Sequence, residues 1–247
     1  MNSAPEGPSR RRAGEMFDRI APRYDFLNRV LSLRRDVVWR RRMARHLPEG
    51  AALRLLDLAT GTGDVMLSLC AIEPRIELAL GVDVSSGMLS RARVKIARGP
   101  GRNRGRDAAA PRCGLARVDA TRLALRDASF DVATIAFGIR NVIDVDAALR
   151  EMRRVLRRKG RALVLEFSLP GNALLRELYL LYFRRVLPRI GGLISGDIQA
   201  YRYLNETVET FPYGEAFCAL MRAAGFVEVR AVPLTFGIAM LYVGVVV

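Results

Sequence analysis

Carboxylates and glycines gather around one short stretch of this sequence, at a spacing that could serve a bound ligand. Residues 53–58 form an apolar run typical of a buried strand, which ends shortly before Gly61, Thr62 and Gly63. A helical apolar pattern then begins at Val65. Two glycines at a strand-to-helix junction permit a tight turn and close approach of a ligand to the backbone, and the helix start adds free N–H donors.

The charges beside this turn favour one kind of cofactor over another. The third glycine of the dinucleotide fingerprint would fall at position 66, where the chain has Met66, and this counts against NAD. Asp57 and Asp64 flank the turn, and two carboxylates would repel a pyrophosphate but suit a positively charged cofactor. S-adenosyl-L-methionine, with its sulfonium and amino groups, meets that requirement. Taken alone, the glycines are explained equally well as a packing turn.

Two more acidic residues follow the next two predicted strands. Residues 76–82 predict a strand that ends at Asp83, where a carboxylate can accept hydrogen bonds from both hydroxyls of a ribose. Residues 115–118 predict a third strand, and we place Asp119 and Ala120, which follow it, at the adenine edge. Three consecutive strands that each end in an acidic residue or a glycine turn are difficult to explain by packing.

A fourth predicted strand, residues 129–137, supplies the reaction side of the site. Ligands of open parallel sheets bind beyond the carboxyl ends of the strands, at the switch in strand order. Arg140 and Asn141 follow this strand directly, so we place them near the reacting group. The structural alternative for Arg140 is a surface ion pair with Asp144 or Asp146.

Composition limits the class of protein further. The chain has 247 residues, 51% of them hydrophobic, which suits one domain with a full core. Its three cysteines are widely spaced and its only histidine is His46, which argues for a reducing compartment and against a structural metal or a histidine-based triad. No segment has the roughly 20 apolar residues of a membrane helix.

The charge balance is strongly basic. The formal net charge is +15 and the pI is about 10.9. Such a surface attracts anionic partners, either a membrane leaflet or nucleic acid. The sequence has no arginine-aromatic module of the RNA-binding kind. We therefore rank three explanations of the positive charge. A soluble protein with a generally basic composition comes first, attraction to a membrane surface second and nucleic-acid binding third.

The segments outside the sheet are predicted to be a tail, an insertion and two lids. Residues 1–14 are polar, lack the apolar core of a signal peptide and predict a disordered tail ahead of a single domain, residues 15–247. Residues 16–45 predict N-terminal lid helices, and residues 171–210 predict a second helical lid on the substrate side. Residues 98–114, rich in glycine, arginine and alanine, predict a flexible surface insertion.

The second lid contains an unusual helical pattern. Residues 172–194 are apolar almost all round, with aromatic residues and interleaved arginines. A basic amphipathic helix of this kind lies at a membrane interface or covers an apolar substrate, although core packing is the commoner explanation. The remaining patterns predict helices at residues 147–156 and 213–224, and strands at residues 161–167 and within residues 231–247.

Five stretches carry a resemblance to a known family. Residues 56–64 and 81–89 look like the first and second motifs of class I methyltransferases. Residues 137–142, 163–170 and 201–204 more specifically resemble the ubiquinone/menaquinone biosynthesis C-methyltransferases, of the demethylmenaquinone methyltransferase type. The resemblance extends from about position 16 to the C-terminal end.

This resemblance implies an α/β class I methyltransferase fold, Rossmann-like, with a seven-stranded, mostly parallel sheet, an antiparallel last strand and a helical lid. It implies C-methylation of a prenylated quinol with S-adenosyl-L-methionine, demethylmenaquinol being favoured slightly over the ubiquinone precursor 2-methoxy-6-polyprenyl-1,4-benzoquinol. The expected catalytic residues are Arg140, Asn141 and Tyr201, and the expected cofactor-binding residues are Gly61, Thr62, Gly63, Asp83, Asp119, Ala120 and Ala136. No metal is expected.

A lipid substrate also implies where the protein works. We expect a cytoplasmic protein with peripheral contact at the inner face of the membrane and no specific nucleic acid; a homodimer is left open. The alternatives are a small-molecule methyltransferase outside quinone synthesis and a basic RNA-associated binding protein. A nucleic-acid amino-methyltransferase would usually carry Asn/Asp-Pro-Pro-Tyr/Phe after the fourth strand, where this chain has residues 137–140, Phe-Gly-Ile-Arg.

The chain departs from the family pattern at three positions. Arg34 replaces a usual glycine and Asp36 a usual histidine, and we interpret Asp36 as part of a solvated helix face. Tyr242 replaces another usual histidine, and the sequence assigns it no role. The N-terminal motif itself is retained at Tyr24, Asp25, Asn28 and Ser32 and ends at Trp39.

Overall fold

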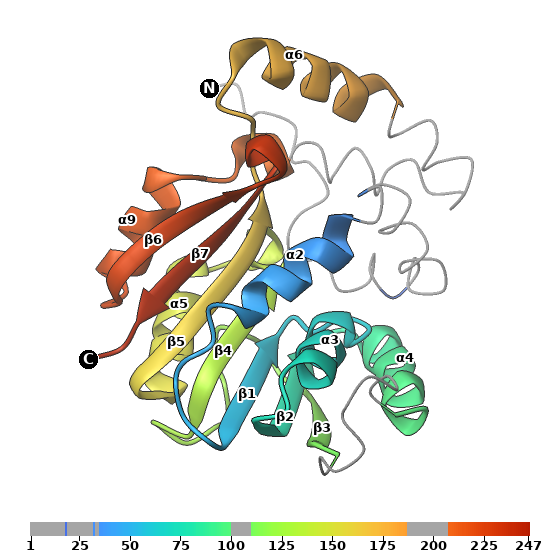
Figure 1. Ribbon diagram of the computed structural model, residues 1–247, viewed down its shortest axis with the longest axis vertical. Coiled ribbons are helices and arrows are strands. Elements are labelled where there is room, and N and C mark those ends of the chain that lie inside the picture. Colours follow the sequence, from blue (N-terminus) through green and yellow to red (C-terminus); the bar gives the residue numbers. More distant parts are fainter. Residues whose placement is uncertain (1–17, 19–31, 33–34, 100–109, 187–206) are drawn as a thin grey trace, which may run out of the picture.

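A twisted seven-stranded sheet forms the centre of the molecule (Figure 1). The computed structural model describes residues 18, 32, 35–99, 110–186 and 207–247. The strand order is β3-β2-β1-β4-β5-β7-β6, and only β7 runs antiparallel to its neighbours. The predicted sheet, with its antiparallel last strand, is confirmed. The strands are β1 (Leu53–Leu58), β2 (Ile76–Asp83), β3 (Arg112–Arg117), β4 (Phe130–Ala136), β5 (Leu156–Phe167), β6 (Val227–Leu234) and β7 (Ala239–Val245).

Helices cover both faces of the sheet (Figure 1). In the central strand β1, Leu55 and Leu56 point to opposite faces because successive side chains alternate. The face beneath Leu55 packs against α2 (Arg35–Ala44) and α3 (Asp64–Ile72), with α4 (Ser86–Ala97) beside them. The face beneath Leu56 packs against α5 (Val145–Val155) and α9 (Glu215–Ala223). Two apolar cores therefore hold β1 rigidly, which fixes the turn at its carboxyl end.

Strand β3 differs from the prediction because it is an edge strand. It begins at Arg112, three residues before the predicted start, and pairs only with β2. Arg112 is exposed and Gly114 has no side chain, so neither gave an apolar signal. Residues 112–114 therefore belong to the sheet and not to the predicted insertion, whose residues 100–109 lie outside the described residues.

The junction between α5 and β5 also lies elsewhere than predicted. Helix α5 begins two residues early because the Asp144 carboxylate accepts a hydrogen bond from the Ala147 N–H at 2.8 Å and caps it. Strand β5 begins at Leu156, five residues early, and accommodates Lys159 at φ +63° beside a register shift against β4. The bulge concealed the strand start, since its charged residues resemble a loop in sequence.

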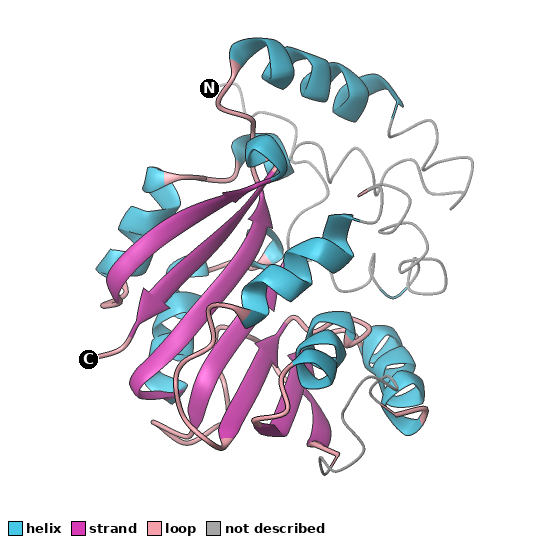
Figure 2. Cartoon of the chain, in the orientation of Figure 1, coloured by secondary structure: helices cyan, strands magenta, loops and turns pink. Residues whose placement is uncertain are grey.

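Helix α6 (Ala173–Leu181) stands apart from the sheet, beyond the carboxyl end of β5 (Figures 1 and 2). A single π-helical turn, η3 (Tyr182–Val186), continues it, and together they form the described part of the predicted helix at residues 172–194. The predicted end of one strand and all of the next within residues 231–247 are confirmed as β6 and β7, joined by the short turn η4 (Thr235–Gly237).

Tyr242 has a structural role. It is 1% exposed on β7, packs against Phe217 with ring centroids 4.6 Å apart, and its hydroxyl accepts a hydrogen bond from the Gly214 N–H at 2.8 Å. Gly214 is the residue from which α9 begins. The departure from the family pattern at this position therefore supports the packing of α9.

Candidate active site

The glycine turn joins β1 to α3 in a left-handed conformation. Gly61 and Gly63 have φ of +56° and +81°, a region that other residues rarely adopt, and Gly63 is the N-cap of α3. A Cβ placed on Gly61 would meet no atom of the described residues within 4 Å, so these residues leave space beside this stretch of backbone. The predicted turn is therefore present, with room for a ligand beside it.

Asp57 is an anchor inside the protein. The residue is 1% exposed, and its two oxygens accept hydrogen bonds of 2.6 Å from the hydroxyls of Thr60 and Thr134. Burial raises the pKa of Asp57 to about 6, against the effect of these two bonds. Its carboxylate therefore holds the turn to β4 and is not presented to a ligand, contrary to the expectation that both flanking carboxylates face the cofactor.

Asp64, the other flanking carboxylate, is paired with two cations. Its oxygens lie 2.5 Å from Lys95 Nζ and 3.1 Å from Arg40 Nη1. Lys95 also donates a 2.8 Å hydrogen bond to the hydroxyl of Thr62, whose side chain is buried. The expected negative charge at the turn is thus compensated, and the Thr62 side chain serves the turn itself.

Asp83 lies at the end of β2, as predicted, and connects two loops of the site. Its carboxylate accepts hydrogen bonds from the Gly61 N–H at 2.8 Å and the Ser85 N–H at 2.9 Å. Burial raises the pKa of Asp83, and the nearby charge of Asp18 raises it further. Asp18 in turn accepts hydrogen bonds from the Ser85 hydroxyl at 2.5 Å and the Gly87 N–H at 2.9 Å, which secures the start of α4.

The third acidic strand end is also in place. The Val118 N–H donates to the Asp83 carbonyl at 3.1 Å, which aligns the two chain ends. Asp119 is exposed, and its Oδ1 accepts hydrogen bonds from the backbone and hydroxyl of Thr121 at 2.8 and 2.9 Å. Ala120 is buried behind it. Gly61, Asp83 and Asp119 thus form one edge, as the sequence predicted.

Arg140 is buried, and its ion pair differs from the predicted alternative. Ala136 ends β4, and Arg140 and Asn141 follow in the short turn η2 (Ile139–Asn141). Arg140 Nη1 lies 2.6 Å from Glu166 Oε1 and donates to the Phe137 carbonyl at 2.8 Å. The partner is therefore a buried glutamate of β5, and the surface pair with Asp144 or Asp146 is not formed.

Two polar atoms in η2 have no partner among the described residues. Arg140 Nε and Asn141 Oδ1 are both buried without a hydrogen bond. Buried polar atoms are nearly always satisfied, so these two atoms are positions in η2 at which a bound group could form hydrogen bonds. The other predicted catalytic residue, Tyr201, lies outside the described residues, as do Tyr24, Asp25, Asn28 and Arg34.

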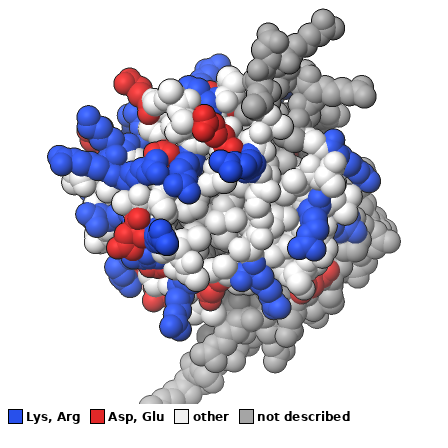
Figure 3. Space-filling model, turned by 90° about the horizontal axis from the view of Figure 1, so that it is seen from below, with Lys and Arg blue, Asp and Glu red and all other residues white. Residues whose placement is uncertain are grey.

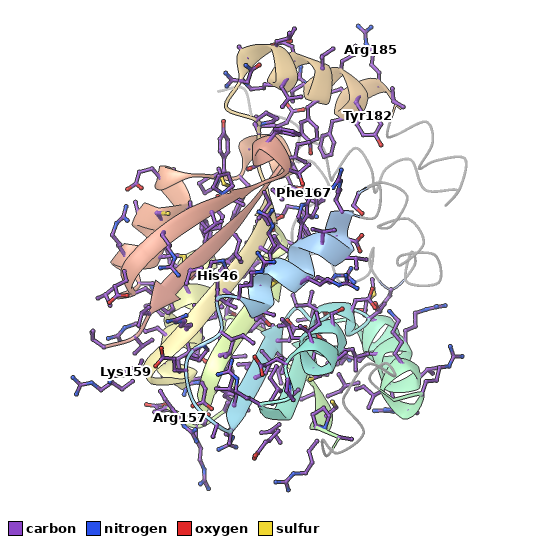
Figure 4. All side chains as sticks on the ribbon, in the orientation of Figure 1. His46, Arg157, Lys159, Phe167, Tyr182 and Arg185 are labelled. Carbon is purple, nitrogen blue, oxygen red and sulfur yellow. The ribbon has the colours of Figure 1, made fainter. Side chains whose placement is uncertain are left out.

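Aromatic rings line the region beside Arg140. Phe137 and Phe167, at the ends of β4 and β5, lie 4.5 Å apart between centroids, and Trp39 contacts both. Arg140 Cζ lies 5.6 Å from the Phe167 ring centroid. Figure 4 shows Phe167 below α6 and below Tyr182, with which η3 begins. Aromatic rings and the Arg140 guanidinium thus lie side by side at the strand ends. This combination suits the binding of a flat aromatic molecule.

Asp36 is not solvated, contrary to the prediction. It is 2% exposed and accepts hydrogen bonds from Arg40 Nη2 at 2.7 Å and the Ser32 hydroxyl at 2.8 Å. Because Arg40 also contacts Asp64, a continuous series of polar contacts runs from Ser32 through α2 and Lys95 to Thr62.

Sequence reasoning missed four residues of this site: Asp18, Arg40, Lys95 and Glu166. For Arg40 a usable signal existed, because Asp36 and Arg40 are four residues apart on a helix, a spacing that favours an ion pair. Glu166 lies within a stretch that resembles the family, at the carboxyl end of a strand. Asp18 and Lys95 reach the site only through tertiary structure, so spacing could not reveal them.

Among the described residues, no group of histidine, cysteine and acidic side chains comes together as a metal site. In the same part of the chain, no helix is long and apolar enough to cross a bilayer.

The residues of this edge fit an adenosine-bearing group. Open space borders Gly61, and the Asp83 carboxylate stands at the strand end where a ribose would lie. Together with the sheet order, this edge defines a class I methyltransferase that uses S-adenosyl-L-methionine. A solved S-adenosylmethionine-dependent methyltransferase of Thermotoga maritima shares this fold, with a TM-score of 0.62 and 22% identity over 94% of this chain and 98% of that one.

The comparisons with known sequences go further. The chain belongs to the ubiE/COQ5 methyltransferase family, whose model matches residues 7–246. It is 50% identical to a ubiquinone/menaquinone biosynthesis C-methyltransferase UbiE of Syntrophotalea carbinolica, over 93% of this chain and 92% of that protein. It is 48% identical to a demethylmenaquinone methyltransferase of Thermus thermophilus, over 93% of this chain and 99% of that protein. The predicted family is confirmed.

Proposed function

We propose that this chain methylates a ring carbon of a prenylated quinol, with demethylmenaquinol as the favoured acceptor. Membership of the ubiE/COQ5 methyltransferase family over nearly the whole chain carries this proposal. Relatives from Thermus thermophilus and Deinococcus radiodurans are named demethylmenaquinone methyltransferases, which favours that acceptor. Others are named for both quinones, so the ubiquinone precursor is the second candidate.

In this proposal, different residues of the cofactor edge contact different parts of the cofactor. When bound, S-adenosyl-L-methionine supplies an electrophilic methyl group on its sulfonium. Gly61 admits it close to the backbone while Gly63, packed against Ala92 of α4, shapes the turn; Asp83 accepts from the ribose hydroxyls, and Asp119 and Ala120 border the adenine. Holding both reactants in a near-attack geometry contributes on the order of 7–11 kcal/mol to lowering the barrier.

The acceptor needs a different kind of help. A ring carbon becomes nucleophilic when a neighbouring hydroxyl ionises, so the site must stabilise a phenolate while the new carbon–carbon bond forms and the carbon–sulfur bond breaks. Arg140 supplies the cation that stabilises the phenolate. Glu166 holds its Nη1, while its Nε is buried without a hydrogen bond to a described residue. Asn141 and Tyr201 orient the ring, and the ring proton then leaves to a base that we do not assign.

The proposal extends to the membrane. A prenylated acceptor resides in the bilayer, and a chain with a net charge of +15 is attracted to an anionic leaflet. We therefore place the protein in the cytoplasm, in peripheral contact with the inner face of the membrane.

Mass analysis of lipid extracts tests the reaction and the acceptor together. Cells that lack the protein should accumulate a quinone short by one methyl group, and the wild-type gene should restore the mature quinone. Asp83→Ala should fail to restore it because cofactor binding is lost. Arg140→Ala should also fail, while purified Arg140→Ala protein still binds S-adenosyl-L-methionine.

Arg150→Ala is the matched control, since Arg150 is an exposed arginine of α5 away from the site, and it should restore the quinone fully. An unchanged quinone pool in cells without the protein would overturn the acceptor and direct the search to other small molecules or RNA. Full activity of Arg140→Ala, or loss of cofactor binding by it, would overturn the role of Arg140.

A further inference from the structure

The outer face of α6 carries three exposed leucines, with the exposed Glu177 at its edge. Leu174, Leu178 and Leu181 are 72%, 56% and 49% exposed. Their spacing of four and then three residues places them on one side of the helix. None of the residues of α6 is buried. An amphipathic helix usually turns its apolar stripe to the core, and here three leucines of that stripe face outward.

A further exposed apolar side chain lies at the same end of the molecule. Phe236, in η4, is 82% exposed and is held at φ +57°. The next residue, Gly237, accepts a 2.5 Å hydrogen bond from the Ser168 hydroxyl, so η4 packs on the segment that leads into α6. An exposed phenylalanine in this conformation contributes nothing to the core. Phe236 and the three leucines are thus exposed apolar side chains at the same end of the molecule, and we name them together the α6 surface.

Arginines border the α6 surface. Arg176 lies within α6 and Arg185 lies in η3 directly after it, whereas the neighbouring Arg184 is paired with Glu209. Figure 4 shows Arg185 pointing away from the body of the molecule, whereas Tyr182 points back toward it. Leucine and phenylalanine edged by arginine is the combination that binds the boundary of an anionic bilayer, where the apolar side chains enter the acyl region and the cations meet the headgroups.

The opposite side of α6 turns toward the site. Tyr179 stacks on the buried Phe183, with ring centroids 5.2 Å apart. Burial raises the pKa of Tyr179, and the charge of Arg140 is close enough to oppose that rise. One helix therefore has its inner side near Arg140 and its outer side in solvent.

We propose that the α6 surface is where the protein docks on an anionic lipid bilayer, so that an acceptor leaving the bilayer passes the inner side of α6 to reach Arg140. The proposal rests on the proposed function, which places the acceptor in the membrane. Its rival occupants are a second copy of the chain and a segment of this chain outside the described residues.

Vesicle flotation of the full chain tests the docking surface. The wild-type protein should float with vesicles of phosphatidylcholine mixed with phosphatidylglycerol and much less with phosphatidylcholine alone. The double variant Leu174→Asp and Leu178→Asp, and separately Phe236→Ser, should bind the anionic vesicles at least tenfold more weakly. Val94→Asp is the matched control, because Val94 is an exposed valine on α4, 52% exposed, and its binding should equal that of the wild type.

Turnover separates this proposal from the proposed function. The double variant should methylate a short-chain, water-soluble quinol at the wild-type rate and lose at least tenfold on a quinol embedded in vesicles. The docking surface would be overturned if the double variant bound anionic vesicles as tightly as the wild type does. It would also be overturned if the wild-type protein bound no vesicles and formed a dimer that the two substitutions convert to a monomer. Vesicle binding that depends on the leucines, with no turnover of either quinol, would overturn only the proposed function.

Discussion

Arg140 and Glu166 form an ion pair that is almost fully withdrawn from water, with 6% and 1% of the two side chains exposed. Removing two charges from water is costly, and burying them rarely stabilises a fold more than apolar residues would. The pair therefore needs a reason other than stability. Glu166 also accepts a 2.9 Å hydrogen bond from the Phe167 N–H, so the guanidinium is held against the end of β5. In the proposed reaction this fixes the cation where a phenolate would develop.

Replacement of the glutamate should expose this function. Glu166→Gln retains an acceptor for Arg140 and Phe167 but leaves the guanidinium uncompensated. We expect the acid limb of the pH profile of kcat to move to lower pH, because the bare cation favours the ionised quinol more strongly. The free energy of unfolding should fall by about 3 kcal/mol, since one partner of a buried pair is lost.

Steady-state rates across pH and urea unfolding measure the two effects. Glu151→Gln, on the surface-facing ion pair with Arg154, is the control and should leave the pH profile unchanged. An unchanged profile for Glu166→Gln would mean that Glu166 acts only in folding.

Helix α2 connects the N-terminal part of the chain to the cofactor turn. Its residue Arg40 is 7% exposed and bridges Asp36 and Asp64, while Lys95 bridges Asp64 and Thr62. The contact between Arg40 and Asp36 lies within α2. The contacts of Asp64 with Arg40 and Lys95 join α2, α3 and α4, and the contact of Lys95 with Thr62 reaches the glycine turn. Disturbing α2 should therefore affect the turn through the contact of Arg40 with Asp64.

Arg40→Ala tests this link. We expect weaker binding of S-adenosyl-L-methionine and a free energy of unfolding lower by about 3 kcal/mol, because the buried Asp36 loses its cation. Arg41→Ala changes the neighbouring exposed arginine of the same helix and should alter neither quantity. Calorimetric titration with the cofactor, together with urea unfolding, measures both.

A second variant separates folding from binding. Lys95→Met removes the contact with Thr62 from a side chain that is 25% exposed, so its effect on stability should be small. It should still weaken cofactor binding severalfold. Unchanged cofactor affinity in Lys95→Met would show that the polar contacts of α2 serve folding alone.

The elements differ in how well the sequence predicted them, for physical reasons. β1 and its glycine turn were predictable because a strand buried on both faces is rich in apolar residues, here four leucines in six positions, and the turn demands glycine. β3 was misplaced because an edge strand is not required to be apolar. α6 was identified as basic and amphipathic, but its bare outer face was not predicted, since a helical pattern does not say which side meets the core.

The site shows the same division. Asp83 and Arg140 were placed at the correct strand ends, because strand ends follow from the apolar pattern. Their partners were not predicted because they are distant in sequence. Glu166 lies 26 residues from Arg140, and Asp18, near the N-terminal end, comes close to Asp83 only in the folded chain. Asp36 was assigned to solvent, and only the fold shows that Arg40 and the core enclose it.

At the scale of the whole molecule, basic side chains crowd one another. Figure 3 shows Lys and Arg side chains spread over the face seen from below, on which the amino ends of the parallel strands lie. Burial and the charges of Arg230, Arg161 and Arg45 lower the pKa of His46. A net charge of +15 on one domain therefore repels itself, which disfavours the compact state.

Salt should relieve this repulsion. Raising NaCl from about 0.02 M to about 0.5 M shortens the range of the repulsion severalfold and should raise Tm by about 2–4 °C, the shift that accompanies about 1 kcal/mol in a chain of this length. In the double variant Arg45→Glu and Arg158→Glu, the net charge falls by four, so the rise in Tm caused by salt should be smaller than in the wild type. Thermal unfolding followed by circular dichroism measures it. An equal increment in both proteins would assign the salt effect to something other than net charge.

The contact between Gly138 and Ala59 limits how this site can change in evolution. A Cβ on Gly138 would lie 2.7 Å from the Ala59 Cβ, so the loops after β1 and β4 meet without room for a further side chain. Substitutions are therefore excluded where these two loops touch, whereas α6 has no buried residue, so packing in the core does not limit its substitutions. New acceptor specificities in relatives of this chain would be acquired by changing the helix above the site, with the junction of the two loops inherited intact.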